Sequence, residues 1–92
     1  MFLNKIEKEE IAQLHFSSGE VLNDQSQISS RNHALQKAVI LGNTEKQKCK
    51  IVFHANEGVS YVETTVWAVT DQYICLKGGI TLMIACVIEI IL

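Results

Sequence analysis

Residues 48–92 read KCKIVFHANEGVSYVETTVWAVTDQYICLKGGITLMIACVIEIIL, in which short apolar runs alternate with turn residues. In the first run, residues 48–54, the side chains of Cys49, Ile51 and Phe53 fall on one face of an extended chain. Apolar residues at every second position are typical of a strand that buries one face. The run therefore predicts a half-buried β-strand, and we read the rest of the chain outward from it.

Turn residues separate this first run from four more. Asn and Gly tolerate the positive φ of a tight turn, which indicates a turn at residues 55–58. The pair Gly78-Gly79 lies between two alternating runs, where it is typical of a hairpin. Ala85-Cys86 is expected to form a short break with one 3₁₀ turn. The expected strands are residues 48–54, 59–70, 73–77, 80–84 and 87–92.

The second of these runs, residues 59–70, is long and has β-branched or aromatic side chains on both faces. A strand of this kind often bends and contributes to two sheets. Five strands of this size and order resemble an SH3-like or Sm-like small barrel. The sequence thus predicts a mainly β fold with α, in which a five-stranded SH3-like (Sm-like) small barrel follows one amphipathic helix and an N-terminal arm.

The helix is predicted over residues 29–42, with Ser29 or Ser30 as its N-cap. Gly42 stands where a C′ residue in the left-handed conformation is expected, so the helix should end there. Its apolar face comprises Leu35, Ala38 and Val39. Its solvent face is expected to carry Arg31, Asn32, Gln36 and Lys37.

The segment 1–28 is an N-terminal arm with two alternative interpretations. Residues 4–15 fit a short helix, whereas residues 15–22 fit a small hairpin around Ser18-Gly19. The polar residues 23–29 are expected to form a loop. The whole chain, residues 1–92, has the length of a single domain.

Composition favours a soluble cytoplasmic protein. The most apolar stretch, residues 79–92, contains Glu89 and is shorter than the roughly 20 residues that a membrane-spanning helix needs. The N-terminus is too charged for the apolar region of a signal peptide. The three cysteines, Cys49, Cys75 and Cys86, are odd in number and lack a CxxC pair, so we expect reduced thiols.

No catalytic, phosphate-binding or metal-binding motif is present in the sequence. Cys49 and His54 are separated by an odd number of positions, so in one regular strand they point to opposite faces and cannot act as a pair. We therefore expect no enzyme activity, no metal and no cofactor. A pocket that joins Cys75 or Cys86 to a histidine would favour an enzyme instead.

Charge is distributed unevenly along a chain whose net charge is −2. Between residues 29 and 54 there are five basic side chains and one acidic one, Glu45. The candidate nucleic-acid face comprises Arg31, Lys37, Lys46, Lys48, Lys50 and His54. An Sm-like nucleic-acid-binding protein would use the Lys46–Lys50 part of this face to contact phosphates. The alternative interpretation is a solvated face whose lysines prevent the sheet edge from pairing with another chain.

Three aromatic residues, Tyr61, Trp67 and Tyr73, are candidates for the barrel rim, where they could stack on a ligand if exposed. Trp67 fits either the core or the rim. The final strand is apolar on both faces, which requires cover on both. Its candidate partner face comprises Val87, Glu89 and Ile91.

Two kinds of cover are consistent with this final strand. A second copy or another protein could cover one face, or the N-terminal arm could do so with Phe2, Leu3 and Ile6. The leading hypothesis is a non-catalytic binding or assembly module that uses the C-terminal strand or the barrel rim. Its partner would be a protein or a second copy, nucleic acid is the alternative, and no membrane is expected.

Three stretches, 34–43, 62–70 and 76–80, together resemble a group of small bacterial proteins of unassigned function. The resemblance implies the barrel fold and a bacterial setting, and it implies no activity. It also implies a proline near Met83 and polar or basic residues near Ala85 and Cys86, where this sequence differs.

Overall fold

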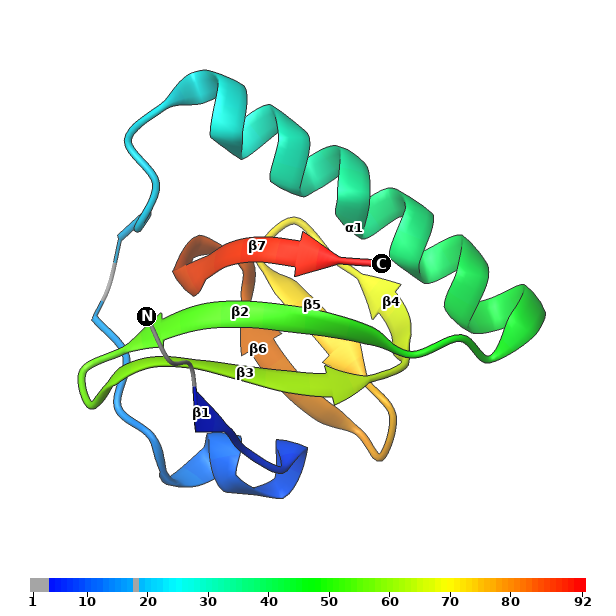
Figure 1. The fold of residues 1–92 in the computed structure, drawn as a ribbon, viewed down its shortest axis with the longest axis horizontal. Coiled ribbons are helices and arrows are strands. Elements are labelled where there is room, and N and C mark those ends of the chain that lie inside the picture. The colour runs from blue at the N-terminus through cyan, green and yellow to red at the C-terminus, as the bar shows by residue number, and fades with distance from the viewer. Residues whose placement is uncertain (1–3, 18) are drawn as a thin grey trace.

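The computed structural model describes residues 4–17 and 19–92 and shows one long helix with seven strands in two sheets (Figure 1). The mixed α and β content agrees with the prediction. In chain order the elements are β1 (Asn4–Lys5), η1 (Lys8–Gln13), α1 (Gln25–Glu45), β2 (Cys49–Ala55), β3 (Gly58–Thr64), β4 (Val66–Val69), β5 (Tyr73–Leu76), β6 (Ile80–Met83), η2 (Ile84–Cys86) and β7 (Val87–Ile91).

The long run 59–70 bends, as expected, and contributes to both sheets. It is interrupted at Thr65, so that β3 lies in a sheet of order β1-β3-β2-β7 and β4 lies in a sheet of order β4-β5-β6. All pairs are antiparallel except β1 with β3. The Gly78-Gly79 turn also forms, and both glycines have the positive φ that such a turn requires.

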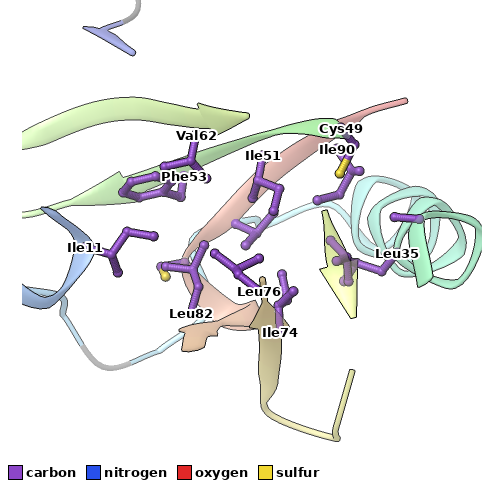
Figure 2. Packing of buried hydrophobic residues seen from close by; sticks show 14 of the residues in the cluster. Ile11, Leu35, Cys49, Ile51, Phe53, Val62, Ile74, Leu76, Leu82 and Ile90 are labelled. Atoms are coloured by element: carbon purple, nitrogen blue, oxygen red, sulfur yellow. The ribbon is translucent and has the colours of Figure 1, made fainter. Parts of the chain in front are cut away.

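The hydrophobic core lies between the two sheets, and two helical elements cover its sides. The helix α1 packs against β4 and β7, whereas η1 packs against β6 and β3. Figure 2 shows Ile11 reaching the core from η1 on one side and Leu35 reaching it from α1 on the other. Each of these side chains is almost fully buried, so both elements are part of the core.

The helix is longer than the predicted 29–42, and both predicted ends are wrong. It starts at Gln25 because the Asp24 side chain accepts a hydrogen bond of 2.9 Å from the backbone N–H of Ser26. It ends at Glu45, and the C-cap residue Lys46 adopts the left-handed conformation with φ of 56°. Polar residues had suggested a loop over 23–29, but they form the cap and the exposed first turns.

Gly42 does not end the helix and is instead buried where α1 crosses β4. A Cβ atom at this position would overlap with the carbonyl oxygen of Val66 and would lie 3.0 Å from Cγ2 of Thr65. Glycine is therefore required here for close approach of two backbones rather than for a positive φ.

The partner face predicted for the final strand is partly wrong. The register shifts between Val52 and Phe53, so that Phe53 pairs with Val87 while Val52 pairs with Glu89. This irregularity turns Val87 inward, where it is completely buried. Glu89 and Ile91 remain exposed, as expected for the outer face.

The first described part of the N-terminal arm, β1, lies against β3, whereas Leu22, near the end of the arm, lines a cavity beside β7. The backbone N–H of Ile6 donates to the carbonyl of Tyr61 at 2.9 Å, which extends the pairing of β1. Residues 8–13 form a 3₁₀ helix, close to the predicted short helix. Phe2, Leu3 and the Ser18 position of the alternative hairpin lie outside the described residues.

Candidate functional site

A groove runs between α1 and β7, the strand at the edge of the larger sheet. The two elements are in contact, and α1 runs beside β7 on the side opposite β2 (Figure 1). The groove consists of two adjoining depressions of about 470 and 630 Å³, which share Ser30 and Ala34. We call it the α1–β7 groove and define it by the residues Leu22, Ser26, Ser30, Ala34, Lys37, Ile88, Ile90 and Leu92.

The two walls of the α1–β7 groove differ in chemistry. The helix wall carries Ser26, Ser30 and Ala34 at intervals of four residues, which lie on one face of a helix. These side chains are small, which allows α1 to lie close to β7. The strand wall combines the apolar Ile88 and Ile90 with the exposed acidic side chain of Glu89, and the adjacent Ile91 keeps 44% of its surface exposed.

An ion pair fixes the start of the groove. Both terminal nitrogens of Arg31 donate to the Glu20 carboxylate, each at 2.6 Å. The Arg31 side chain is 3% exposed and that of Glu20 is 32% exposed. A two-point contact of this kind is strong and directional. It fastens the segment before α1 to the helix.

Arg31 also contacts the edge strand directly. Its Nη1 donates to the carbonyl oxygen of Val87 at 3.0 Å, whereas its buried Nε–H has no hydrogen-bond partner within the described structure. Sequence analysis assigned Arg31 to the solvent face of the helix and to the basic face, and both assignments are wrong. Nothing in the spacing of residues 20 and 31 indicated that they would pair.

The ion pair predicts a dependence of stability on pH. Its hydrogen bonds hold the pKa of Glu20 below the usual 4.5. Because the pKa is lower in the folded protein, this contribution is fully present above about pH 4.5 and is lost as the pH falls through the folded pKa. We expect the unfolding free energy in urea titrations to fall more steeply below pH 4.5 in the wild type than in the variant Glu20→Gln. If the unfolding free energies of the two proteins fell with the same slope below pH 4.5, the prediction would be wrong.

A second cleft, of about 570 Å³, lies on the other side of α1. It is bounded by Asn32 and Gln36 on the helix and by Thr70, Asp71 and Gln72 on the turn before β5. Its floor is apolar and includes Leu35 and Val69. This cleft mixes apolar, uncharged polar and charged groups, and the mixture does not single out a class of ligand.

The predicted basic face is divided in the structure. Lys46 and Lys48 follow α1, and Lys50 lies on β2, all three exposed. Lys37 lies apart from them in the α1–β7 groove, and His54 lies near the opposite end of β2. With Arg31 buried, the exposed basic cluster is reduced to the stretch from Lys46 to Lys50.

Acidic side chains interrupt this cluster on the sheet. Lys50 pairs in register with Glu63, which also lies 3.5 Å from Lys5. On its other side, Lys50 pairs with Ile91 of β7. The ammonium of Lys50 lies 5.8 Å from the centroid of the Tyr61 ring, within the range of a cation–π contact.

The structure does not bring the three candidate rim aromatics together. Tyr61 lies on β3 in the larger sheet, whereas Trp67 and Tyr73 lie on β4 and β5 in the smaller one. Trp67 is 49% exposed and is therefore not a core residue. A register shift between Val66 and Ala68 places it outward.

Two of the three cysteines, Cys49 and Cys86, are buried thiols. Burial raises the pKa of Cys49 and that of Cys86 to about 11, so both thiols stay protonated at neutral pH. Cys49 is buried and His54 is exposed, which confirms that they lie on opposite faces. In residues 4–17 and 19–92, no three His, Cys, Asp or Glu side chains gather as a metal site would require.

Comparison of the chain with models of protein families, with curated proteins and with solved structures gave no match. None of the described helices has both the length and the apolar character needed to cross a membrane.

Sequence reasoning missed Glu20, the pairing role of Arg31 and the helix wall of the groove. The spacing of Ser26, Ser30 and Ala34 was visible, but the helix was expected to begin after Ser26.

Proposed function

We propose that this chain is an SH3-like small β-barrel that acts as a non-catalytic binding module and takes another polypeptide on the edge of β7. The observation that carries this proposal is the position of β7 at the end of the strand order β1-β3-β2-β7. β7 therefore pairs with a strand on one side only. An edge strand offers unpaired backbone groups to an incoming chain.

The order of the strands supports the barrel. Strand β2 is followed along the chain by the bent pair β3 and β4 and then by β5, β6 and β7. The last of these, β7, returns to pair with β2. A 3₁₀ turn, η2, separates β6 from β7. This is the arrangement expected of a small SH3-like barrel whose second strand bends between two sheets. Fold alone does not define function, so the proposal depends on β7.

The exposed apolar surface supports binding at this edge. Ile91 and Leu92 are 44% and 47% exposed, and they follow directly after the buried part of β7. Natural edge strands commonly carry lysine, proline or a bulge that blocks further pairing. β7 has such an irregularity near its start and the exposed Glu89 in its middle, but its end carries two large apolar residues, and the helix beside it presents small ones.

The substitution Ile91→Lys tests this proposal. The immobilised full chain is used to select from a phage library of random dodecapeptides, and we expect it to retain peptides with apolar residues at alternate positions. A lysine on the edge opposes strand addition, so Ile91→Lys should reduce retention at least about tenfold. Ile40→Lys is the control, because Ile40 is also exposed but lies outside the groove.

Both variants should melt within a few degrees of the wild type, because they replace exposed side chains. Selection of no peptide by the wild type would reject the proposed function. Equal retention by Ile91→Lys and the wild type would reject β7 as its location.

Nucleic-acid binding is the alternative function, and the exposed run of Lys46, Lys48 and Lys50 is the observation that favours it. Phosphate contacts from lysines would make such binding fall steeply with salt. We expect the double reversal Lys48→Glu with Lys50→Glu to abolish retention of single-stranded RNA and to leave peptide selection unchanged, as measured by filter binding at two salt concentrations. Retention that survives the reversal would exclude this face.

A further inference from the structure

We propose that the outer face of the smaller sheet is the interface of a weak, two-fold symmetric dimer, in which β5 of one copy lies antiparallel across β5 of the other. This inference goes beyond the proposed function, because it uses a different sheet from the one that contains β7. The outer face of the smaller sheet comprises Trp67, Ala68, Tyr73, Cys75, Thr81 and Met83.

The direction of the side chains in this sheet follows from its core residues. Ile74, Leu76 and Leu82 are almost fully buried and point into the core (Figure 2). Successive side chains of a strand point to opposite faces. The alternate positions of β5 and β6 therefore point away from the core: Tyr73, Cys75, Thr81 and Met83. Cross-strand pairing places these four side by side in one surface.

Strand β4 adds the largest side chain of this face. Trp67 lies at the register shift, and both it and Ala68 are exposed. Ala68 pairs with Cys75, which continues the surface from β4 to β5. Trp67 and Tyr73 both remain exposed although they are large and apolar. Aromatic side chains of this kind commonly anchor protein interfaces.

The outer faces of the two sheets differ in charge. On the larger sheet the outward side chains include Lys50, Glu63 and Glu89. The six residues of the outer face of the smaller sheet carry no charge. An antiparallel sheet that meets water on one side normally has polar side chains there. A surface of aromatic, aliphatic and sulfur-containing side chains therefore indicates a contact with another protein.

Charges at the two ends of β5 identify the occupant as a second copy. Asp71 lies in the turn before β5, and Lys77 lies in the turn after it. Both are exposed, and among the residues that the structure describes neither belongs to an ion pair. When two copies cross antiparallel, each Asp71 faces the Lys77 of the other copy. The face is thus complementary to itself, as a two-fold interface requires.

The size of the face predicts that the dimer is weak. Its strands β4, β5 and β6 have four residues each. With strands about 4.8 Å apart and about 3.4 Å per residue, the face measures roughly 14 by 14 Å. Interfaces that bury less than about 1,200 Å² in total are typical of weak and transient complexes. We therefore expect a dissociation constant on the order of 100 μM.

Sedimentation velocity of the full chain between about 20 μM and about 1 mM tests the dimer. The mean mass should rise toward that of two chains over this range. Trp67→Lys should weaken association at least about tenfold, because it replaces the largest apolar contact by a charge. Ile40→Lys and Ile91→Lys are controls, since both residues are exposed but lie outside this face, and both variants should associate as the wild type does.

The variants Lys77→Glu and Asp71→Lys test the antiparallel arrangement. Each variant alone brings like charges together twice in the dimer, so its self-association should fall at least about fivefold. An equimolar mixture of the two variants should recover the association of the wild type, because every acidic position then faces a basic one. Both substitutions are at exposed turn positions, so the melting temperature should change by only a few degrees.

Cys75 provides a chemical test of the same contact. It lies within β5 and is partly exposed, whereas Cys49 and Cys86 are buried. A short bismaleimide should therefore join two wild-type chains through Cys75. The variant Cys75→Ser should give no linked dimer, and Trp67→Lys should give much less of it than the wild type.

A monomer at every concentration would overturn the inference. So would a dimer that Trp67→Lys leaves intact, a dimer that Ile91→Lys dissociates, or a dimer that does not cross-link through Cys75. A mixture of the two charge variants that stays monomeric would also overturn it. Peptide selection at β7 is a separate measurement, so the failure of this inference is distinguishable from the failure of the proposed function.

Discussion

The substitution Glu20→Ala is expected to lower the unfolding free energy by about 3 kcal/mol, as measured by urea denaturation at neutral pH. The variant leaves the guanidinium of Arg31 buried without its carboxylate partner. Removing one member of a buried pair costs about 3–5 kcal/mol, and we expect the lower end because Glu20 is 32% exposed. A domain of this size has a total stability on the order of 5 kcal/mol, so much of it would be lost.

A double-mutant cycle separates the charge effect from lost packing. Arg31→Met keeps an apolar side chain against the core and removes the buried charge. When Arg31→Met is present, Glu20→Ala should cost less than about 0.5 kcal/mol, because no guanidinium remains unpaired. If Glu20→Ala lowered the unfolding free energy equally in the wild type and in Arg31→Met, the ion pair would contribute nothing beyond the packing of each side chain.

The substitution Gly42→Ala is expected to destabilise the fold by about 3 kcal/mol, although alanine normally stabilises an exposed helix by about 1 kcal/mol relative to glycine. The reason is steric, because the new methyl group would overlap with the carbonyl of Val66. The backbone of Val66 cannot rotate away as a side chain could, so α1 would have to shift away from β4. Thermal denaturation followed by circular dichroism measures the loss.

The control for this prediction is Ser29→Ala, at an exposed position of the same helix. It should leave the melting temperature unchanged or raise it slightly, as the intrinsic preference of alanine predicts. If Gly42→Ala raised the melting temperature by a similar amount, the close approach of α1 to β4 would be wrong.

The strands were the part of the fold that the sequence predicted best. Their signal is local, since alternation and turn residues act over a few positions. Cys49, Ile51 and Phe53, which share one face of the first predicted strand, are all buried. Alternation failed at Val87 and left the side of Trp67 open, because the irregular pairing at both places depends on the neighbouring strand and leaves no local trace.

The helix and the candidate site depended on contacts between distant residues. Glycine is common just after the end of a helix, which suggested a helix end at Gly42, yet close packing against Val66 determines the role of this residue. Arg31 had the spacing of a solvent-facing residue, yet a carboxylate eleven positions earlier allows its burial. The groove itself needed both the full length of α1 and the edge position of β7, and neither follows from a single segment.

The return of β7 to β2 also has a consequence for the order of folding. β2 to β6 are joined by short turns, so each strand meets its neighbour soon after synthesis. β7 must instead close a loop that contains β3, β4, β5 and β6, and contacts between distant residues form slowly. Until that closure, the edge that β7 protects in the native protein is exposed on β2. The stage at which this chain is most prone to intermolecular pairing is therefore the one before its last strand is in place.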